Sequence, residues 1–292
     1  MKDSIIPQIE AATFSEVRTR GGIWYDNSGD DFRVQRSLHE ADFFMPHYHM
    51  HTTYEVHFAI TGHTELECGT QKVELHAPYI AIHRPYIPHR LCRKFEDHPY
   101  FRYVLNFTED FLSRAVEWVP DIEKLFPHSF FALELQREMC DRLQPYLENT
   151  FRLYAESRWE TSQLAAALLL ADMAAVLPDS RTMAQGGRIR YMDEVIRYIM
   201  DHISEKLICG DVAAQFFVSE SKLAMDFRKS FGLTFNQFLM QLRVKMAKDM
   251  LAQGASAAET AGACGFCSSS YFIKVFRSYV GQTPAEFGRS LQ

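Results

Sequence analysis

The chain has 292 residues, a length that suggests about two domains. Its composition, 47% hydrophobic and 23% charged, is typical of globular proteins and excludes a collagen-like, low-complexity or wholly disordered chain. The net charge of −6 argues against a uniformly basic nucleic-acid binder, but the two ends differ. Residues 186–292 contain 13 Lys and Arg against 10 Asp and Glu, whereas residues 1–185 contain 18 against 27. Ten of the 12 His residues lie between His39 and His98, in the acidic part.

Neither a secretory signal nor a membrane span is apparent. The first residues have no apolar core of the kind that signal peptides carry. The longest apolar stretch, Leu164–Leu177, is interrupted by Asp172 and is shorter than the roughly 20 residues that a bilayer requires. Six scattered Cys residues in a chain that needs no disulfides favour a reducing compartment. We therefore expect a cytoplasmic protein with no membrane partner.

The front of the chain has the pattern of short β-strands. Residues 54–60 and 79–83 alternate with a period of two, and 101–107 is a further β-like run. Residues 64–68 and 72–75 have the spacing of a hairpin. Many short strands with turns between them indicate a barrel or a sandwich. The aromatic residues expected in its core are Tyr54, Phe58, Tyr79 and Phe101.

The pattern then becomes helical. Residues 108–126 and 132–177 are rich in Leu, Ala, Glu, Arg and Met at helical spacing. One helix face within them carries Leu164, Leu168, Ala171 and Ala175. Such a face can pack against a second copy, so we expect a homodimer. Residues 178–190, with Pro, Ser and a Gly pair, have the composition of a linker, and the chain beyond them is helical throughout.

The back third contains an internal repeat. A shift of 49 residues places Ala214 on Ala263, Phe217 on Phe266, Ser219 on Ser268, Ser221 on Ser270, Phe227 on Phe276, Gly232 on Gly281 and Thr234 on Thr283. Two copies are too few for a solenoid, which usually needs at least about three. The repeat therefore indicates a duplicated supersecondary unit.

Each copy has the pattern of a helix-turn-helix. A short Ala-rich helix, residues 211–217 or 257–263, precedes a tight turn and a second helix, residues 219–231 or 268–280. Ser at the start of the second helix can accept from free N–H groups, and Gly at its end favours a left-handed cap. The expected core anchors are Leu223, Phe227, Phe272 and Phe276.

The outer faces of the second helices carry hydroxyl and positive side chains suited to phosphate and base-edge contacts. The predicted DNA-contacting residues are Ser219, Ser221, Lys222, Met225, Arg228, Lys229, Ser268, Ser269, Ser270, Lys274 and Arg277. Any surface helix can carry such residues, but two copies in register favour DNA contact. Asp226 on the first of these helices would repel phosphate if it faced DNA.

These motifs resemble the DNA-binding domain of AraC/XylS-type transcription regulators. The resemblance covers Tyr191–Gly288 and rests on a Gly265-Phe266 turn, the Tyr271-Phe272 pair and a terminal Thr-Pro-x-x-Phe ending at Phe287. It implies two helix-turn-helix units joined by a long helix, for which Phe235–Leu251 is the candidate. Both recognition helices would then enter successive major-groove segments of promoter DNA. The resemblance also favours an activator that works with RNA polymerase.

The histidine-rich segment carries the string His49-Met-His51-Thr-Thr-Tyr-Glu55, followed by Gly62 and later by His89. This string resembles the first motif of the cupin barrel, and residues 77–89 resemble the second. Cupin-like sensors precede the DNA-binding domain in many AraC-type regulators. On one strand, alternate side chains would share a face. The predicted ligand-binding residues are His49, His51, Glu55, His57 and His89, with His47 and His83 as further candidates.

Three interpretations of this cluster remain open. His49, His51, Glu55 and His89 could hold a divalent metal, since imidazole and carboxylate are suitable ligands. The same positions could instead hydrogen-bond a sugar-like effector in a metal-free pocket. They could also be structural polar residues inside a barrel. No cofactor follows with certainty from the sequence.

The sequence therefore predicts an α+β protein. Residues 1–177 would form a cupin-like β-barrel sensor with a helical dimerisation segment, residues 178–190 a linker, and residues 191–292 an all-α DNA-binding domain with two helix-turn-helix units. We expect a ligand-responsive transcription regulator and not an enzyme, and the resemblance favours activation of carbohydrate-utilisation genes. The alternatives are a cupin-type metalloenzyme with a helical appendage, or a DNA-binding protein with a non-sensing barrel.

Overall fold

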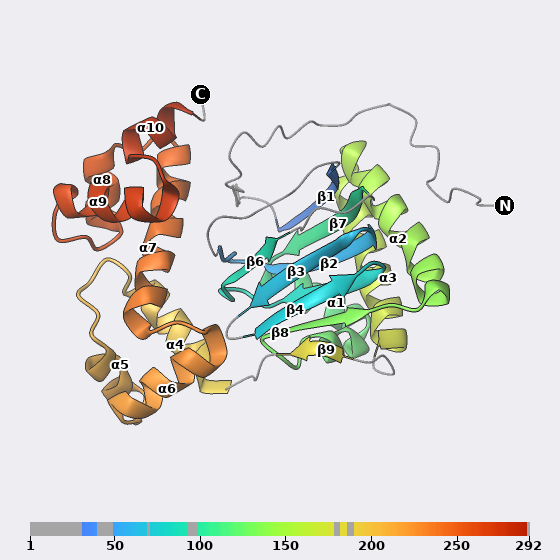
Figure 1. Cartoon of the computed structure of the whole chain (residues 1–292), viewed down its shortest axis with the longest axis horizontal. Helices are drawn as coiled ribbons and strands as arrows, with labels where there is room; N and C mark the ends of the chain where they lie inside the picture. Colours follow the sequence, from blue (N-terminus) through green and yellow to red (C-terminus); the bar gives the residue numbers. More distant parts are fainter. Residues whose placement is uncertain are drawn as a thin grey trace.

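The structure, a computed structural model, describes residues 31–39, 49–68, 71–92, 99–177, 182–185 and 190–290. A β-rich N-terminal domain is followed by an all-helical C-terminal domain (Figure 1). The predicted α+β fold class is confirmed.

Two antiparallel sheets form the N-terminal domain. The larger sheet has the strand order β1-β7-β2-β5-β8-β9, and the smaller has the order β4-β3-β6. The larger sheet consists of β1 (Phe32–His39), β2 (Tyr54–Thr61), β5 (Tyr79–His83), β7 (Tyr100–Phe107), β8 (Phe130–Glu134) and β9 (Thr182–Gln185). The smaller sheet consists of β3 (His63–Cys68), β4 (Gln71–His76) and β6 (His89–Cys92). Every run for which the sequence predicts a strand is a strand.

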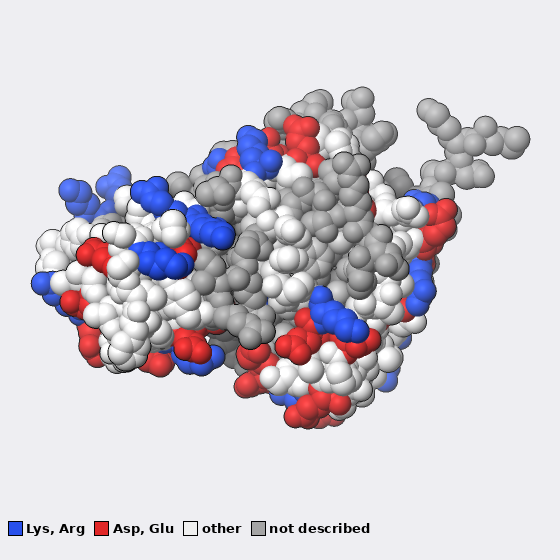
Figure 2. All heavy atoms as spheres, turned by 90° about the horizontal axis from the view of Figure 1, so that it is seen from below, with Lys and Arg blue, Asp and Glu red and all other residues white. Residues whose placement is uncertain are grey.

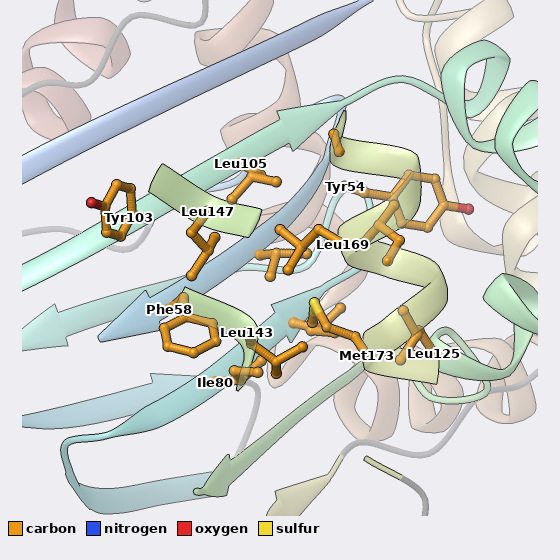
Figure 3. Packing of buried hydrophobic residues seen from close by; sticks show 14 of the residues in the cluster. Tyr54, Phe58, Ile80, Tyr103, Leu105, Leu125, Leu143, Leu147, Leu169 and Met173 are labelled. Atoms are coloured by element: carbon orange, nitrogen blue, oxygen red, sulfur yellow. The ribbon is translucent and has the colours of Figure 1, made fainter. Parts of the chain in front are cut away.

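Helices cover one face of the larger sheet. They are α1 (Glu109–Trp118), the 3₁₀ helix η1 (Pro120–Leu125), α2 (Arg137–Ala155) and α3 (Trp159–Val176). Phe58 of β2 packs in one cluster with Leu147 of α2 and Leu169 of α3 (Figure 3). Because successive residues of a strand point to opposite faces, Glu55 and His57 point away from these helices, toward the smaller sheet. The aromatic residues predicted for the core are buried: Tyr54, Phe58, Tyr79 and Phe101.

Two strands contradict the sequence prediction, and two more, β1 and β6, lie where it names no strand. Residues 132–134, for which composition predicts helix, belong to β8, which pairs with β5 along its length. A short apolar run is compatible with either helix or strand, and pairing with β5 makes this one a strand. β9 lies within the predicted linker and pairs with β8, with Gln185 opposite Phe131. Residues 182–185 of the predicted linker are therefore part of the larger sheet.

The outer face of α3 is exposed although it is apolar. Leu164 and Leu168 are 50% and 59% exposed, whereas Leu169 and Leu170 on the opposite face are buried. Within the described residues, no helix combines the length and the apolar character that a bilayer crossing requires.

The C-terminal domain is built around a long central helix. Its helices are α4 (Arg190–Asp201), α5 (Cys209–Gln215), α6 (Glu220–Phe231), α7 (Phe235–Ala252), α8 (Ala257–Ala263), α9 (Ser269–Val280) and α10 (Pro284–Arg289). α7 connects the group of α5 and α6 to the group of α8, α9 and α10 (Figure 1). It matches the connecting helix predicted for residues 235–251. Capping boxes at Thr234, Ser256 and Thr283 start α7, α8 and α10.

Candidate functional site

The two helix-turn-helix units have the caps that the sequence predicts. Ser219 accepts a hydrogen bond from the backbone N–H of Lys222, and Ser268 accepts one from Tyr271, both at 3.2 Å. Gly232 and Gly281 end the recognition helices α6 and α9 in the left-handed conformation. The predicted core anchors are fully buried: Leu223, Phe227, Phe272 and Phe276.

The repeat changes register at the turn. The backbone N–H of Val218 bonds to the carbonyl of Ala213, and that of Phe266 bonds to the carbonyl of Ala261, so the first helices align at a shift of 48. The recognition helices align at 49, because the second turn is one residue longer. The predicted pairings of Ala214 with Ala263 and of Phe217 with Phe266 are therefore wrong. Val218 is the structural counterpart of Phe266, while the strongly exposed Phe217 corresponds to Gly265.

All the predicted DNA-contacting residues are exposed on α6, α9 or their N-caps: Ser219, Ser221, Lys222, Met225, Arg228, Lys229, Ser268, Ser269, Ser270, Lys274 and Arg277. In the view of Figure 2, Lys and Arg side chains of the C-terminal domain gather mostly along one edge, and Asp and Glu along the other. Charge within this domain is therefore distributed unevenly.

Asp226 is buried and does not face solvent, so it is not placed to repel DNA phosphates. Its carboxylate is buried, accepts a hydrogen bond from the Tyr191 hydroxyl and pairs with Lys222. Burial would raise the pKa of Asp226, but the hydrogen bonds from Lys222 and Tyr191 hold it below its usual value. Asp226 is thus an ionised internal partner that neutralises one cation of the recognition helix.

The sequence prediction missed two exposed apolar side chains on α9. Tyr271 is 46% exposed and Ile273 is 40% exposed. Tyr271 lies three residues before Lys274, so helical spacing alone could have assigned it to the same face. Both can contact bases or sugars beside the predicted polar residues.

The second candidate site is a cluster of imidazoles where β2 of the larger sheet and β6 of the smaller sheet approach one another. One donor atom from each of His49, His51, Glu55 and His89 lies within 4.8 Å of the others. Backbone hydrogen bonds of 3.0 and 2.9 Å between His49 and His89 bring the segment before β2 against the start of β6. Glu55 and His89 are buried, whereas His49 and His51 are partly exposed. The cluster therefore opens toward solvent on one side.

Hydrogen bonding determines which nitrogen of His89 faces the cluster. Its Nδ1 lies 2.9 Å from the carbonyl of Ile87, so Nδ1 carries the proton and donates it. In the neutral ring Nε2 then presents a lone pair to Glu55 Oε1 at 2.9 Å. His51 Nε2 lies 3.1 Å from the other carboxylate oxygen. In that tautomer, His89 Nε2 and Glu55 Oε1 are both acceptors, and they repel one another at 2.9 Å unless a cation or proton lies between them.

Burial and the neighbouring charges favour a neutral His49 beside an ionised Glu55. Burial lowers the pKa of His49 well below its usual value, and the nearby His89 and His51 lower it further. Burial would raise the pKa of Glu55, but His57, His51 and His89 hold it well below its usual range. Neutral imidazoles and an ionised carboxylate are the forms that bind a metal.

Residues behind the cluster orient Glu55. His57 Nε2 lies 2.6 Å from one carboxylate oxygen, and the Asn106 amide donates to the other at 3.1 Å. Arg102 Nη1 lies 3.4 Å from His57 Nδ1, so Nδ1 is the acceptor and Nε2 donates to Glu55. Burial lowers the pKa of His57 to about 4 despite the opposing effect of Glu55. His57 therefore supports the carboxylate as a neutral donor.

This arrangement fits a divalent transition metal. Three imidazoles and one carboxylate are a common set for such ions, and the bonds to the Ile87 carbonyl, His57 and Asn106 orient the ligands as outer-shell partners do. His83 also reaches the cluster, because its ring stacks on that of His89 at 4.0 Å and both its nitrogens lack a hydrogen bond. The sequence prediction missed Arg102 and Asn106, and the remaining candidate, His47, lies outside the described residues.

Comparisons with known proteins match both domains. Residues 212–290 match a family described as a helix-turn-helix domain, and residues 33–171 match the AraC-like ligand binding domain. The uncharacterized HTH-type transcriptional regulator YfiF of Bacillus subtilis is 27% identical over 255 residues, which are 83% of this chain and 78% of that protein. The Msm operon regulatory protein of Streptococcus mutans is 29% identical over 46% of this chain and 47% of its own length.

The fold has a solved counterpart. ToxT from Vibrio cholerae O395 superimposes with a TM-score of 0.60 at 14% identity, and the match covers 90% of this chain and 98% of that one. An identity this low supports the fold alone. The class of protein is that of transcription regulators with a ligand-binding domain ahead of a DNA-binding helix-turn-helix domain. The chain belongs to the AraC family of such regulators.

Proposed function

We propose that this AraC-family regulator binds promoter DNA through α6 and α9 in response to occupancy of the histidine cluster. The observation that carries the proposal is the pair of capped recognition helices whose predicted contact residues are all exposed. α7, with 18 residues, is about 27 Å long, which suits two helices that enter successive major-groove segments. Such a protein would work in the cytoplasm, where its DNA is.

The DNA-binding proposal is tested with the full chain and labelled duplexes from the region upstream of its own gene. Anisotropy titrations at several salt concentrations should give a steep fall in affinity with salt. Arg228→Ala and Arg277→Ala should each lower the salt slope by about 1. Arg137→Ala, an exposed arginine on the sensor helix α2, is the matched control and should leave the slope unchanged. Salt-independent binding, or equal effects of all three variants, would contradict the proposal.

We further propose that His49, His51, Glu55 and His89 hold a divalent metal ion. The four possible ligand atoms that converge within 4.8 Å, and the hydrogen bond that turns His89 Nε2 toward Glu55, support this interpretation over a purely structural one. Zinc titration calorimetry on the chelator-treated chain should show one site, which His89→Ala removes. His76→Ala is the matched control, because His76 is exposed at the barrel surface. Binding that survives His89→Ala would refute the assignment.

A small polar effector would bind beside the metal. Buried hydroxyl groups of Thr53 and Ser129 and both nitrogens of His83 make no hydrogen bonds within the protein. Such groups usually pair with a ligand or ordered water. A polyhydroxylated, sugar-like effector offers matching donors and acceptors, and regulation of carbohydrate-utilisation genes would follow from it. Thermal shifts across a panel of sugars and sugar acids, with and without zinc, test this effector class.

The exposed stripe of α3 would mediate homodimerisation. Leu164 and Leu168 present apolar surface that solvent-facing helix positions seldom carry together. A dimer would place two DNA-binding domains on one promoter and raise the effective concentration of the second. We propose that the bound dimer recruits RNA polymerase as an activator. Transcription from a template with and without the protein, in the presence of the polymerase, tests activation against repression.

A further inference from the structure

One short segment touches both the histidine cluster and the DNA-binding domain. Residues 83–89 connect β5 to β6, and the two ends of the segment, His83 and His89, stack on one another in the cluster. Side chains between them reach the other domain. The segment is therefore a direct physical connection between the proposed sensor site and α4.

The contacts to α4 are both ionic and apolar. Arg84 Nη2 lies 3.3 Å from the carboxylate of Asp193, in the first turn of α4. Ile87 is buried in the same hydrophobic cluster as Met192 and Val195 of that helix. A charged contact and a continuous apolar cluster thus connect the segment to the helix that opens the DNA-binding domain.

The segment is fixed at the cluster by its backbone. The N–H of Tyr86 donates to the carbonyl of His51 at 2.7 Å. The carbonyl of Ile87 accepts from the His89 ring, and His89 exchanges two backbone hydrogen bonds with His49. A displacement of His51 or His89 must therefore move Tyr86 and Ile87 as well.

Tyr86 adopts a left-handed conformation with a φ of 65°. This region is unfavourable for a bulky side chain, and such residues persist where the surroundings hold them. Here the surroundings are the cluster on one side and α4 on the other. The strain lies in the segment that would move when the cluster closes on an ion.

We propose that residues 83–89 couple occupancy of the histidine cluster to the position of α4. The inference rests on the proposed metal site. A cation bound between Glu55 and the imidazoles stabilises the closed cluster, and so holds Arg84 against Asp193. Thermodynamic linkage makes the effect reciprocal. If the bound cation strengthens the contact with α4 by a given factor, loss of that contact weakens cation affinity by the same factor.

Hydrogen–deuterium exchange of the full chain measures this coupling. Zinc chloride added to the chelator-treated protein should slow exchange of the α4 amides by about fivefold, the effect of one partly buried ion pair and its apolar neighbours. At saturating zinc, Arg84→Met should lose the slowing, and by the same linkage it should bind zinc up to about fivefold more weakly than the wild type. Arg142→Met removes an ion pair of the sensor surface, with Asp172, and is the matched control that should keep the slowing.

Two further variants test the same contact in case Arg84→Met does not fold. Asp193→Asn breaks the same contact from the other domain and should also lose the slowing. The double variant with Arg84→Asp and Asp193→Arg, which reverses the ion pair, should restore the slowing. A merely structural role would not predict this recovery. Slowing that persists in Arg84→Met and Asp193→Asn overturns the coupling.

The outcomes distinguish failure of the coupling from failure of the metal site on which it rests. If the wild type binds zinc but α4 exchange is unchanged, the coupling is overturned and the metal site stands. If the wild type binds no zinc, the metal site and the coupling fall together, while DNA binding by α6 and α9 stands on its own titration.

Discussion

Phe217 and Gly265 occupy equivalent turn positions in the two helix-turn-helix units, with opposite consequences. Both have positive φ, 55° and 70°, and each precedes the residue that closes the turn by bonding back to the first helix. Phe217 is 98% exposed and thus loses no burial when its side chain is removed. We expect Phe217→Gly to stabilise the first unit and Gly265→Ala to destabilise the second.

The magnitudes follow from backbone and packing terms. A bulky residue in the left-handed region costs about 1–2 kcal/mol, and glycine there costs about 0.5–1 kcal/mol through the entropy of the unfolded chain. Phe217→Gly should therefore gain about 0.5–1 kcal/mol, and Phe217→Asn, which tolerates this region, should gain less. A Cβ on Gly265 would lie 2.4 Å from the Ile203 carbonyl and 2.7 Å from Arg243 Nη2. Crowding on top of strain should cost at least ~2 kcal/mol.

Native-state hydrogen exchange can resolve the two units within the full chain, whose two domains need not unfold in one step. The opening free energy of α6 amides should rise in Phe217→Gly, and that of α9 amides should fall in Gly265→Ala. The Asn variant should rank between Phe and Gly at position 217. Unchanged or lower α6 protection in Phe217→Gly would show that the side chain makes a stabilising contact, and would refute the reasoning from strain.

Three further outcomes are expected. Asp226→Asn should free the lysine that it pairs with, so DNA affinity at low salt should rise in anisotropy titrations, whereas Asp249→Asn, the same type of pair on α7, should have no effect. Leu164→Glu combined with Leu168→Glu should shift the chain to monomer in sedimentation, and a persistent dimer would exclude the α3 stripe. Because the folded pKa of His57 is about 4, the unfolded state binds more protons below pH ~6.5. Metal-free protein should therefore lose stability as pH falls from ~6.5 to 4, by up to ~1.4 kcal/mol per unit from this group, and a urea midpoint equal at pH 7 and 5 would contradict it.

The DNA-binding domain was the most predictable part because its signals are local. Ser219 and Ser268 as caps, and glycine at the two helix ends, depend on a few neighbouring residues and were all predicted. The error lay in the turn, where one extra residue shifts the repeat from 48 to 49. A fixed shift cannot represent an insertion, so Phe217 was paired with a buried residue although it is exposed.

The sensor domain was predictable only where the local sequence marks a strand, as in β2, β5, β7 and the hairpin of β3 and β4. The period of two identified β2 and β5, whereas β8 is a short apolar run and β9 has no strand pattern. β9 exists because its backbone pairs with β8, and a pairing partner 50 residues away leaves no mark in the local composition. Residues 182–185, which form β9, were therefore assigned to a linker, since their composition indicates turns and their pairing partner is distant in the sequence.

The histidine cluster shows the same division within a single site. His49, His51 and Glu55 lie in one short segment, so their grouping in one site was predictable from that segment alone. Of the residues around Glu55, His57 lies on the same strand, whereas His83 and Asn106 come from neighbouring strands, where the register places them opposite it on either side of β2. Alternation within β5 puts His83 on the interior face but cannot tell which strand lies beside it. Because the supporting residues orient the carboxylate, the chemistry of the cluster depends on strand order, which the sequence motif does not encode.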